Sequence, residues 1–255
     1  MRALLVTMRG ALAEAWANRG AFWVQVATMV VNDIAWVAFW VLFFHRVGTL
    51  RGWDGDRVLL LLAVLTSSAG LVLGLFANAR SLGRLVNGGE IDAALTLPVP
   101  TLPYLLVRRV NSTNLGDVLF GFVLFVVAGS PTPSRVGIYL VGVATSAVLL
   151  TGFLVATGSI ALFAGRDDVG ELSFHGVLLL SSYPVDVFGP IAKVVMYTVV
   201  PAAFLGAVPA KLMDSFDPVV AATMLGAAAF FALLGWVTFN AGLRRYTSGA
   251  VWTNA

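Results

Sequence analysis

The chain has 255 residues, of which 59% are hydrophobic and 11% are charged, and its mean hydropathy is +0.90. Soluble domains carry about 25% charged residues and could not enclose this much apolar surface, so the composition excludes a soluble protein and predicts an integral membrane protein. The net charge of +3 is the excess of 16 Lys and Arg over 13 Asp and Glu, and the basic residues are scattered between apolar segments, which indicates topology signals and lipid contacts and not a nucleic-acid partner. The absence of cysteine excludes disulfides and thiolate chemistry.

The first 20 residues have the pattern of an amphipathic helix. Arg2 and Arg9 border an apolar side, whereas Glu14 and Asn18 lie away from it. This pattern predicts an interfacial helix over residues 1–20, with a cytosolic extension of the first span as the alternative. The apolar side consists of Leu4, Leu5, Met8, Leu12 and Trp16.

The first predicted span covers residues 22–44 and carries Asn32 and Asp33 near its middle. An acid at the centre of a bilayer is unfavourable unless it faces a polar partner or a water-filled cavity. We therefore predict that Asn32 and Asp33 are either pathway or gating residues, or a structural pair that hydrogen-bonds to another helix. A short polar loop, residues 45–57, leads to a second span at residues 58–78.

A long polar connection, residues 79–114, follows the second span and is predicted to leave the membrane. Within it, glycines precede a two-turn helix that has acids in its first turn and ends at Pro98. Ile91 and Leu95 are four residues apart, which predicts one apolar ridge on this helix. A short helix held outside the membrane suits docking to a partner, and a plain surface connection is the alternative.

The next apolar segments are shorter or interrupted. A third span is predicted at residues 115–128, a fourth at 137–163 and a fifth at 172–182, with a polar turn at 165–168. Prolines then break the apolar run of residues 183–213 into pieces too short to cross, which predicts half-helices that dip into the membrane from the extracellular side. This re-entrant hairpin is marked by Tyr183, Pro184, Pro190, Pro201 and Pro209.

The last span, residues 219–241, is the sixth, so both termini are predicted on one side of the membrane. Under this topology ten of the 16 Lys and Arg lie on the side of the termini, which predicts that this side is cytoplasmic. The fold class is therefore all-α, as one polytopic transmembrane domain over residues 1–255. The ten inside residues are Arg2, Arg9, Arg19, Arg80, Arg84, Arg108, Arg109, Arg166, Arg244 and Arg245, and the six outside are Arg46, Arg51, Arg57, Arg135, Lys193 and Lys211.

The sequence carries no pattern typical of an enzyme. It lacks the Gly-x-x-x-x-Gly-Lys-Ser/Thr phosphate loop and the Gly-x-Ser-x-Gly hydrolase motif. Its two histidines, His45 and His175, are far apart and have no neighbouring carboxylate cluster. We expect no catalytic, cofactor-binding or metal residues in this chain, so any use of ATP would be delegated to another polypeptide.

In the order of these parts the chain resembles the ABC-2 type transporter permeases, in particular the six-span branch. The shared parts are the amphipathic start, the loop at residues 89–98, the Tyr183-Pro184 break with prolines beyond it, and the ending at residues 242–248. The resemblance covers nearly the whole length. The tail, residues 249–255, is longer and less basic than the family pattern, which leaves its role open.

This resemblance implies the membrane-spanning subunit of an ATP-binding cassette exporter in a prokaryotic plasma membrane. Residues 1–20 would be its gate helix, and the hairpin would cap the outward side of the pathway. The implied partners are two copies of an ATPase subunit that holds ATP and Mg, a second permease chain, identical or homologous, and membrane lipids. The implied coupling helix, which docks on the ATPase, contains Gly89, Glu90, Ile91, Asp92, Leu95 and Pro98.

The substrate class follows only from the composition of the spans. Spans rich in Phe, Leu, Val and Gly suit a hydrophobic or amphipathic molecule such as a drug, a natural product or a lipid. Two other functions compete with an exporter. A secondary transporter would be expected to have about ten or more spans with internal repeats, which this chain lacks. A membrane scaffold or assembly factor is also compatible with the composition.

Overall fold

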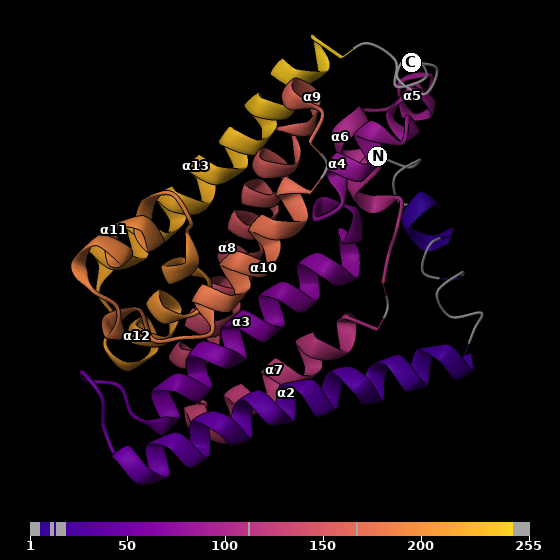
Figure 1. Cartoon of the computed structure of the whole chain (residues 1–255). Coiled ribbons are helices and arrows are strands. Elements are labelled where there is room, and N and C mark those ends of the chain that lie inside the picture. Colours follow the sequence, from indigo (N-terminus) through magenta and orange to yellow (C-terminus); the bar gives the residue numbers. More distant parts are fainter. Residues whose placement is uncertain (1–5, 11–12, 14–18, 112, 167, 247–255) are drawn as a thin grey trace.

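The structure is a computed structural model that describes residues 6–10, 13, 19–111, 113–166 and 168–246 (Figure 1). Within these residues every regular element is helical, apart from an isolated bridge between Leu50 and Trp53. The chain is therefore all-α, as predicted. Residues 6–10 are helical, and most of the rest of the predicted interfacial helix lies outside the described residues.

Four helices in the described part of the chain are long and apolar enough to cross a membrane. They are α2 (Arg19–Val47), α3 (Gly55–Leu75), α8 (Pro133–Gly158), which continues into α9 (Ala161–Ala164), and α13 (Pro218–Leu243). Two further apolar helices are shorter, α7 (Leu115–Gly129) with 15 residues and α10 (Val169–Ser181) with 13. At 1.5 Å per residue these two reach only about 20–23 Å, less than the hydrocarbon thickness of about 30 Å.

Several long helices begin at a side-chain cap that the sequence encodes. The Asp54 side chain accepts a hydrogen bond from the backbone N–H of Arg57 at 2.9 Å, at the start of α3. Thr132 and Asp217 cap α8 and α13, and each is followed by a proline. Proline is favoured there because the first backbone N–H groups of a helix have no partner within the helix.

The centre of the fold is α3, which is largely buried between α7 and α8, whereas most of α2 is exposed. Figure 1 shows α2 and α7 along one edge and α13 along the opposite edge. The helices come very close where a glycine lies at the contact. A Cβ atom at Gly121 of α7 would lie 2.2 Å from the Ser67 hydroxyl oxygen of α3 and 2.5 Å from the carbonyl oxygen of Ala63. Such glycines allow the backbones of packed membrane helices to approach each other.

A cap of short helices covers one end of this bundle. It consists of η1 (Ala77–Ala79), α4 (Leu82–Asn87), α5 (Glu90–Leu95) and α6 (Thr101–Val107), and it packs on α9 and the ends of α8 and α13 (Figure 1). The side-chain amide of Asn78 donates a hydrogen bond to the Leu105 carbonyl at 2.7 Å and so joins η1 to α6. Within the predicted connection, residues 79–107 therefore form a compact layer of short helices.

The opposite end holds four short helices, η2 (Val185–Val187), α11 (Pro190–Thr198), η3 (Ala202–Leu205) and α12 (Ala207–Asp214). Pro184, Pro190, Pro201 and Pro209 lie at or near their starts, where proline costs little helix stability. Both η3 and α12 are buried against α3 and α8, whereas α11 is mostly exposed. The Ser146 hydroxyl of α8 donates a hydrogen bond to the Phe204 carbonyl at 3.0 Å.

Candidate functional site

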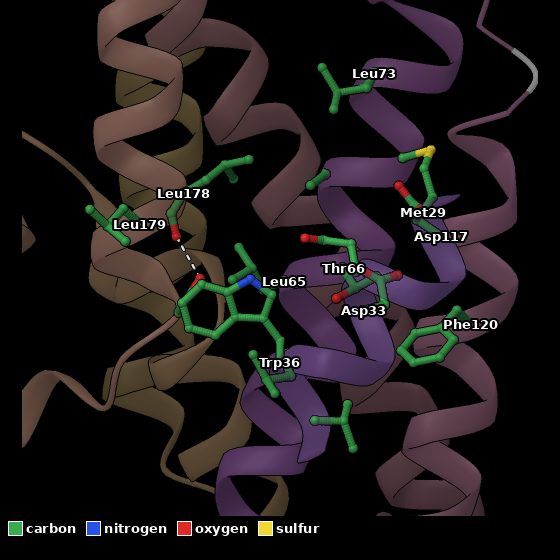
Figure 2. A pocket seen from close by; sticks show the side chains of 15 residues that line it. Met29, Asp33, Trp36, Leu65, Thr66, Leu73, Asp117, Phe120, Leu178 and Leu179 are labelled. Atoms are coloured by element: carbon green, nitrogen blue, oxygen red, sulfur yellow. Dashed lines mark hydrogen bonds between the residues drawn. The ribbon is translucent and has the colours of Figure 1, made fainter. Parts of the chain in front are cut away.

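A cavity of about 340 Å³ lies between α2, α3, α7 and α10 (Figure 2). The predicted residues Asn32 and Asp33 both line it, together with Met29, Trp36 and Val37. These five residues follow a spacing of three and four, so they share the face of α2 that is turned toward the bundle. The structure therefore places the predicted polar pair at a cavity between helices, where Asp33 is part-buried and Asn32 is exposed.

A second acid, Asp117 of α7, lines the same cavity and is only 9% exposed. Figure 2 shows Asp33 and Asp117 on one side of the cavity, across from Leu178 and Leu179. The Asp33 Oδ2 atom is buried and has no hydrogen-bond partner among the described residues. We did not predict Asp117 from the sequence, because an acid in the first turn of a helix is ordinarily explained by the helix dipole. The apolar run that follows Asp117 is the sequence feature that could have indicated an acid next to the membrane interior.

The predicted coupling residues lie in the cap, on and around α5. Gly89 precedes the helix with φ of 70°, a left-handed conformation that favours glycine. Glu90 accepts a hydrogen bond from the Arg108 guanidinium at 2.5 Å, which ties α5 to the end of α6. Asp92 lies in the first turn of α5, and Pro98 lies beyond its end on the surface.

Only one residue of the predicted apolar ridge of Ile91 and Leu95 is on the surface. Ile91 is fully buried in the core of the cap, because α4 and α6 pack against α5, whereas Leu95 is 45% exposed. Leu97 is also exposed, at 40%. The exposed apolar surface at the end of α5 therefore consists of Leu95 and, just beyond the helix, Leu97. Residues four apart on a helix are neighbours, but here one of the two side chains is buried in the cap and the other is exposed.

A family model described as ABC-2 family transporter protein matches residues 30–250 of the chain. The chain belongs to this family. The match includes the cap, the proline-broken segment and all of the cavity lining except Met29, and it confirms the resemblance seen in the sequence. ABC-2 permeases generally work with an ATPase subunit, and the family together with the apolar helices makes this chain a multi-pass membrane protein. Searches of curated proteins and of solved structures each found no match.

In this ABC-2 protein an ion-pair clamp, defined here as Asp186 and Asp214 with their partners, fixes the segment of residues 183–213. Asp186 accepts hydrogen bonds from the Trp53 indole at 2.9 Å and from Lys193 at 3.1 Å, and it also pairs with Lys211. Asp214 pairs with Arg57 at 2.5 Å and with Arg135 at 3.7 Å. The clamp therefore ties the short helices to the starts of α3 and α8.

The Asp186 carboxyl of the clamp is strongly acidic. Partial burial raises its pKa, but hydrogen bonds from Lys211, Trp53 and Lys193 outweigh burial and bring the pKa from 3.8 down to about 2. Because the folded state holds the lower pKa, the carboxylate contributes stability that is complete above about pH 4. That contribution is lost as the pH falls through about 2.

We expect Asp186→Asn to destabilise this end of the ABC-2 protein, because Lys193 and Lys211 lose their shared counter-charge. The loss should be about 1–2 kcal/mol, which lowers the unfolding temperature by about 5 °C. Tryptophan fluorescence during heating at pH 7, pH 5 and pH 3 measures it, with Asp56→Asn on the exposed first turn of α3 as the control. The difference from wild type should persist at pH 5 and shrink at pH 3. Equal shifts for the two variants would contradict a specific clamp.

Tyr183 connects the start of the hairpin to the cavity region. Its ring meets Trp36 edge to face at 6.1 Å and Trp40 at 5.6 Å between ring centroids. Trp36 also lines the cavity, and a neighbouring hollow of about 270 Å³ lies against Asn32, Trp36 and Tyr183. Residues 32–40 of α2 and the hairpin, far apart in the sequence, thus meet at one place in the fold.

Proposed function

We propose that this ABC-2 family protein is the permease subunit of an ATP-binding cassette exporter, driven by a separate ATPase. The family match carries the proposal, since it covers the elements that such a subunit needs. In this proposal the cap docks on the ATPase and the hairpin forms the outer closure of the pathway. The protein crosses a prokaryotic plasma membrane six times and has both termini in the cytoplasm.

The arrangement of the two ends supports this topology. The cap carries Arg80, Arg84, Arg108 and Arg109, as expected for a cytoplasmic layer. The hairpin lies at the other end, near Arg51, Arg57 and Arg135. In this proposal α7 and α10 are the third and fifth spans. The short α10 does not cross the membrane alone, and η3, which packs against it, fills part of the remaining depth. We also propose that the hairpin enters the membrane from the outer side and leaves it on the same side.

A second permease chain completes the proposed pathway. One chain of six spans is too small to enclose a wide channel, and both α2 and α7 present apolar side chains on their outer faces. Such faces suit contact with lipid and with another permease. We propose an assembly of two permeases, identical or homologous, with two ATPase subunits. The exposed apolar residues include Val31, Ile34 and Leu42 on α2 and Leu119, Val123 and Val127 on α7.

Co-expression with ATP-binding cassette subunits from the same genome tests this function. The expected result is a complex of two permeases and two ATPases that accumulates a hydrophobic or amphipathic substrate in inside-out vesicles when ATP is supplied. Transport by the purified chain alone, driven by a proton gradient, would instead establish the alternative of a secondary transporter. A stable complex without ATP-dependent transport would favour an assembly role.

A further inference from the structure

We propose that the cavity between α2, α3, α7 and α10 binds an organic cation, a hydrophobic molecule that carries an amine or onium group. The inference rests on the proposed function in treating this cavity as a substrate site. It narrows the substrate class from hydrophobic or amphipathic molecules to those with a positive charge. Three features of the cavity carry it.

The first feature is a pair of acids that have no basic partner. Asp33 and Asp117 line the cavity, and among its described lining residues there is no Lys, Arg or His. Within the described chain neither acid has a basic group within 4.0 Å. Glu90, Glu171, Asp186 and Asp214, which lie toward the two ends of the bundle, all pair with Lys or Arg.

The second feature is the buried Asp33 Oδ2 atom, which has no hydrogen-bond partner in the described residues. A carboxyl oxygen withdrawn from water without a partner is unfavourable, more so among apolar side chains. An ammonium or onium group placed between Asp33 and Asp117 would supply the missing counter-charge. A neutral or anionic ligand would leave the carboxyl groups uncompensated.

The third feature is the shape and chemistry of the remaining walls. The volume of about 340 Å³ lies in the range of about 300–1,000 Å³ typical of small-molecule sites. Trp36 and Phe120 provide aromatic rings, whose faces attract cations. Leu65, Leu178 and Leu179 make the other side apolar (Figure 2). The cavity thus has an acidic side and an apolar side, which suits a cation with a hydrophobic body.

A pair of ions with similar shape and opposite charge tests the inference. Radiolabelled tetraphenylphosphonium and tetraphenylborate are applied to the full chain, purified in detergent and held on scintillation beads, without ATPase or nucleotide. We expect saturable binding of tetraphenylphosphonium and none of tetraphenylborate beyond micelle background. Equal saturable binding of both ions by the wild-type protein would overturn the inference.

Two substitutions then locate the site. Asp33→Asn and Asp117→Asn should each weaken tetraphenylphosphonium binding by about tenfold or more, because each removes a charge and keeps the shape of the side chain. Glu171→Gln on α10, outside the cavity, is the matched control and should change binding less than about twofold. Gel filtration verifies that each variant is folded. Unchanged binding in a folded Asp33→Asn/Asp117→Asn double variant would overturn the site.

Competition separates an organic from an inorganic cation. Choline chloride and NaCl are compared at equal ionic strength, and neither should displace tetraphenylphosphonium strongly because neither carries a large apolar body. Displacement by Na⁺ but not by choline would assign the cavity to an inorganic cation and overturn the inference. Because no ATPase is present, failure of this binding assay is distinct from failure of ATP-dependent transport, which tests the proposed function.

Discussion

Gly121→Val is expected to prevent correct packing of α7 on α3 and to remove most of the folded protein. A Cβ at this position would lie 2.2 Å from the Ser67 hydroxyl oxygen and 2.5 Å from the Ala63 carbonyl oxygen, and the Ala63 oxygen belongs to the backbone of a buried helix. Because backbone cannot move aside as a flexible side chain can, the two helices must separate. We expect a loss of about 3 kcal/mol, at the upper end for overpacking.

The separation would also break contacts next to Gly121. The Ser67 hydroxyl hydrogen-bonds to the Tyr139 hydroxyl at 2.5 Å, and the Tyr139 ring stacks on Phe125 at 4.3 Å between centroids. These contacts join α3, α7 and α8, so the effect should reach the whole centre of the bundle. Fluorescence-detected gel filtration of membrane extracts measures the folded fraction.

Gly116→Val is the matched control for this prediction. Gly116 lies in the same helix, and a Cβ there would meet no atom within 4 Å. The control should therefore yield folded protein at close to the wild-type level. If Gly121→Val and Gly116→Val gave similar amounts of folded protein, close packing at Gly121 would not be what holds α7 on α3.

Leu95→Asp is expected to uncouple ATP hydrolysis from transport in the proposed exporter while leaving the membrane helices folded. Leu95 lies on α5 at the surface of the cap, 45% exposed, so a charge there costs the isolated permease little. If α5 docks on an ATPase, Leu95 is an apolar anchor at the interface. Loss of such an anchor costs about 2 kcal/mol or more, which weakens assembly by about thirtyfold.

The measurements are the yield of the permease–ATPase complex in detergent and substrate-stimulated ATP hydrolysis. Ile91→Asp is the contrasting variant, since Ile91 is fully buried and a charge there should unfold the cap and lower the protein level itself. Glu90→Ala should be mild, because the partly exposed ion pair with Arg108 contributes little. Normal assembly and coupling of Leu95→Asp would show that α5 is an ordinary surface helix.

Much of the fold could be predicted from the sequence because lipid imposes a simple constraint. Apolar segments of about 20 residues must be helical in a bilayer, and α3, α8 and α13 follow that rule closely. The prolines between residues 183 and 213 correctly indicated a break, since each proline lies at or near a helix start. The number of spans stays a prediction, because α7 and α10 are too short for length alone to decide.

Contacts between distant segments could not be predicted in the same way. Ile91 and Leu95 have the same spacing pattern whether α5 stands alone or lies on other helices, and only the packing of the cap shows that Ile91 is internal. Asp33 could be predicted as a site residue because it stands in the middle of an apolar run, whereas Asp117 stands at the edge of one. Their meeting in one cavity depends on how α2 and α7 pair, which local sequence does not encode.

Trp36 belongs at once to the wall of the cavity and to the contact with Tyr183. The start of the hairpin and the cavity therefore share a boundary, so a shift of the hairpin that moves Trp36 also changes the space available to a ligand. Thermodynamic linkage makes this relation reciprocal. Suppose that a ligand binds more tightly when the hairpin is in one position. Binding of the ligand then stabilises that position of the hairpin, and the free energy gained equals the gain in binding free energy.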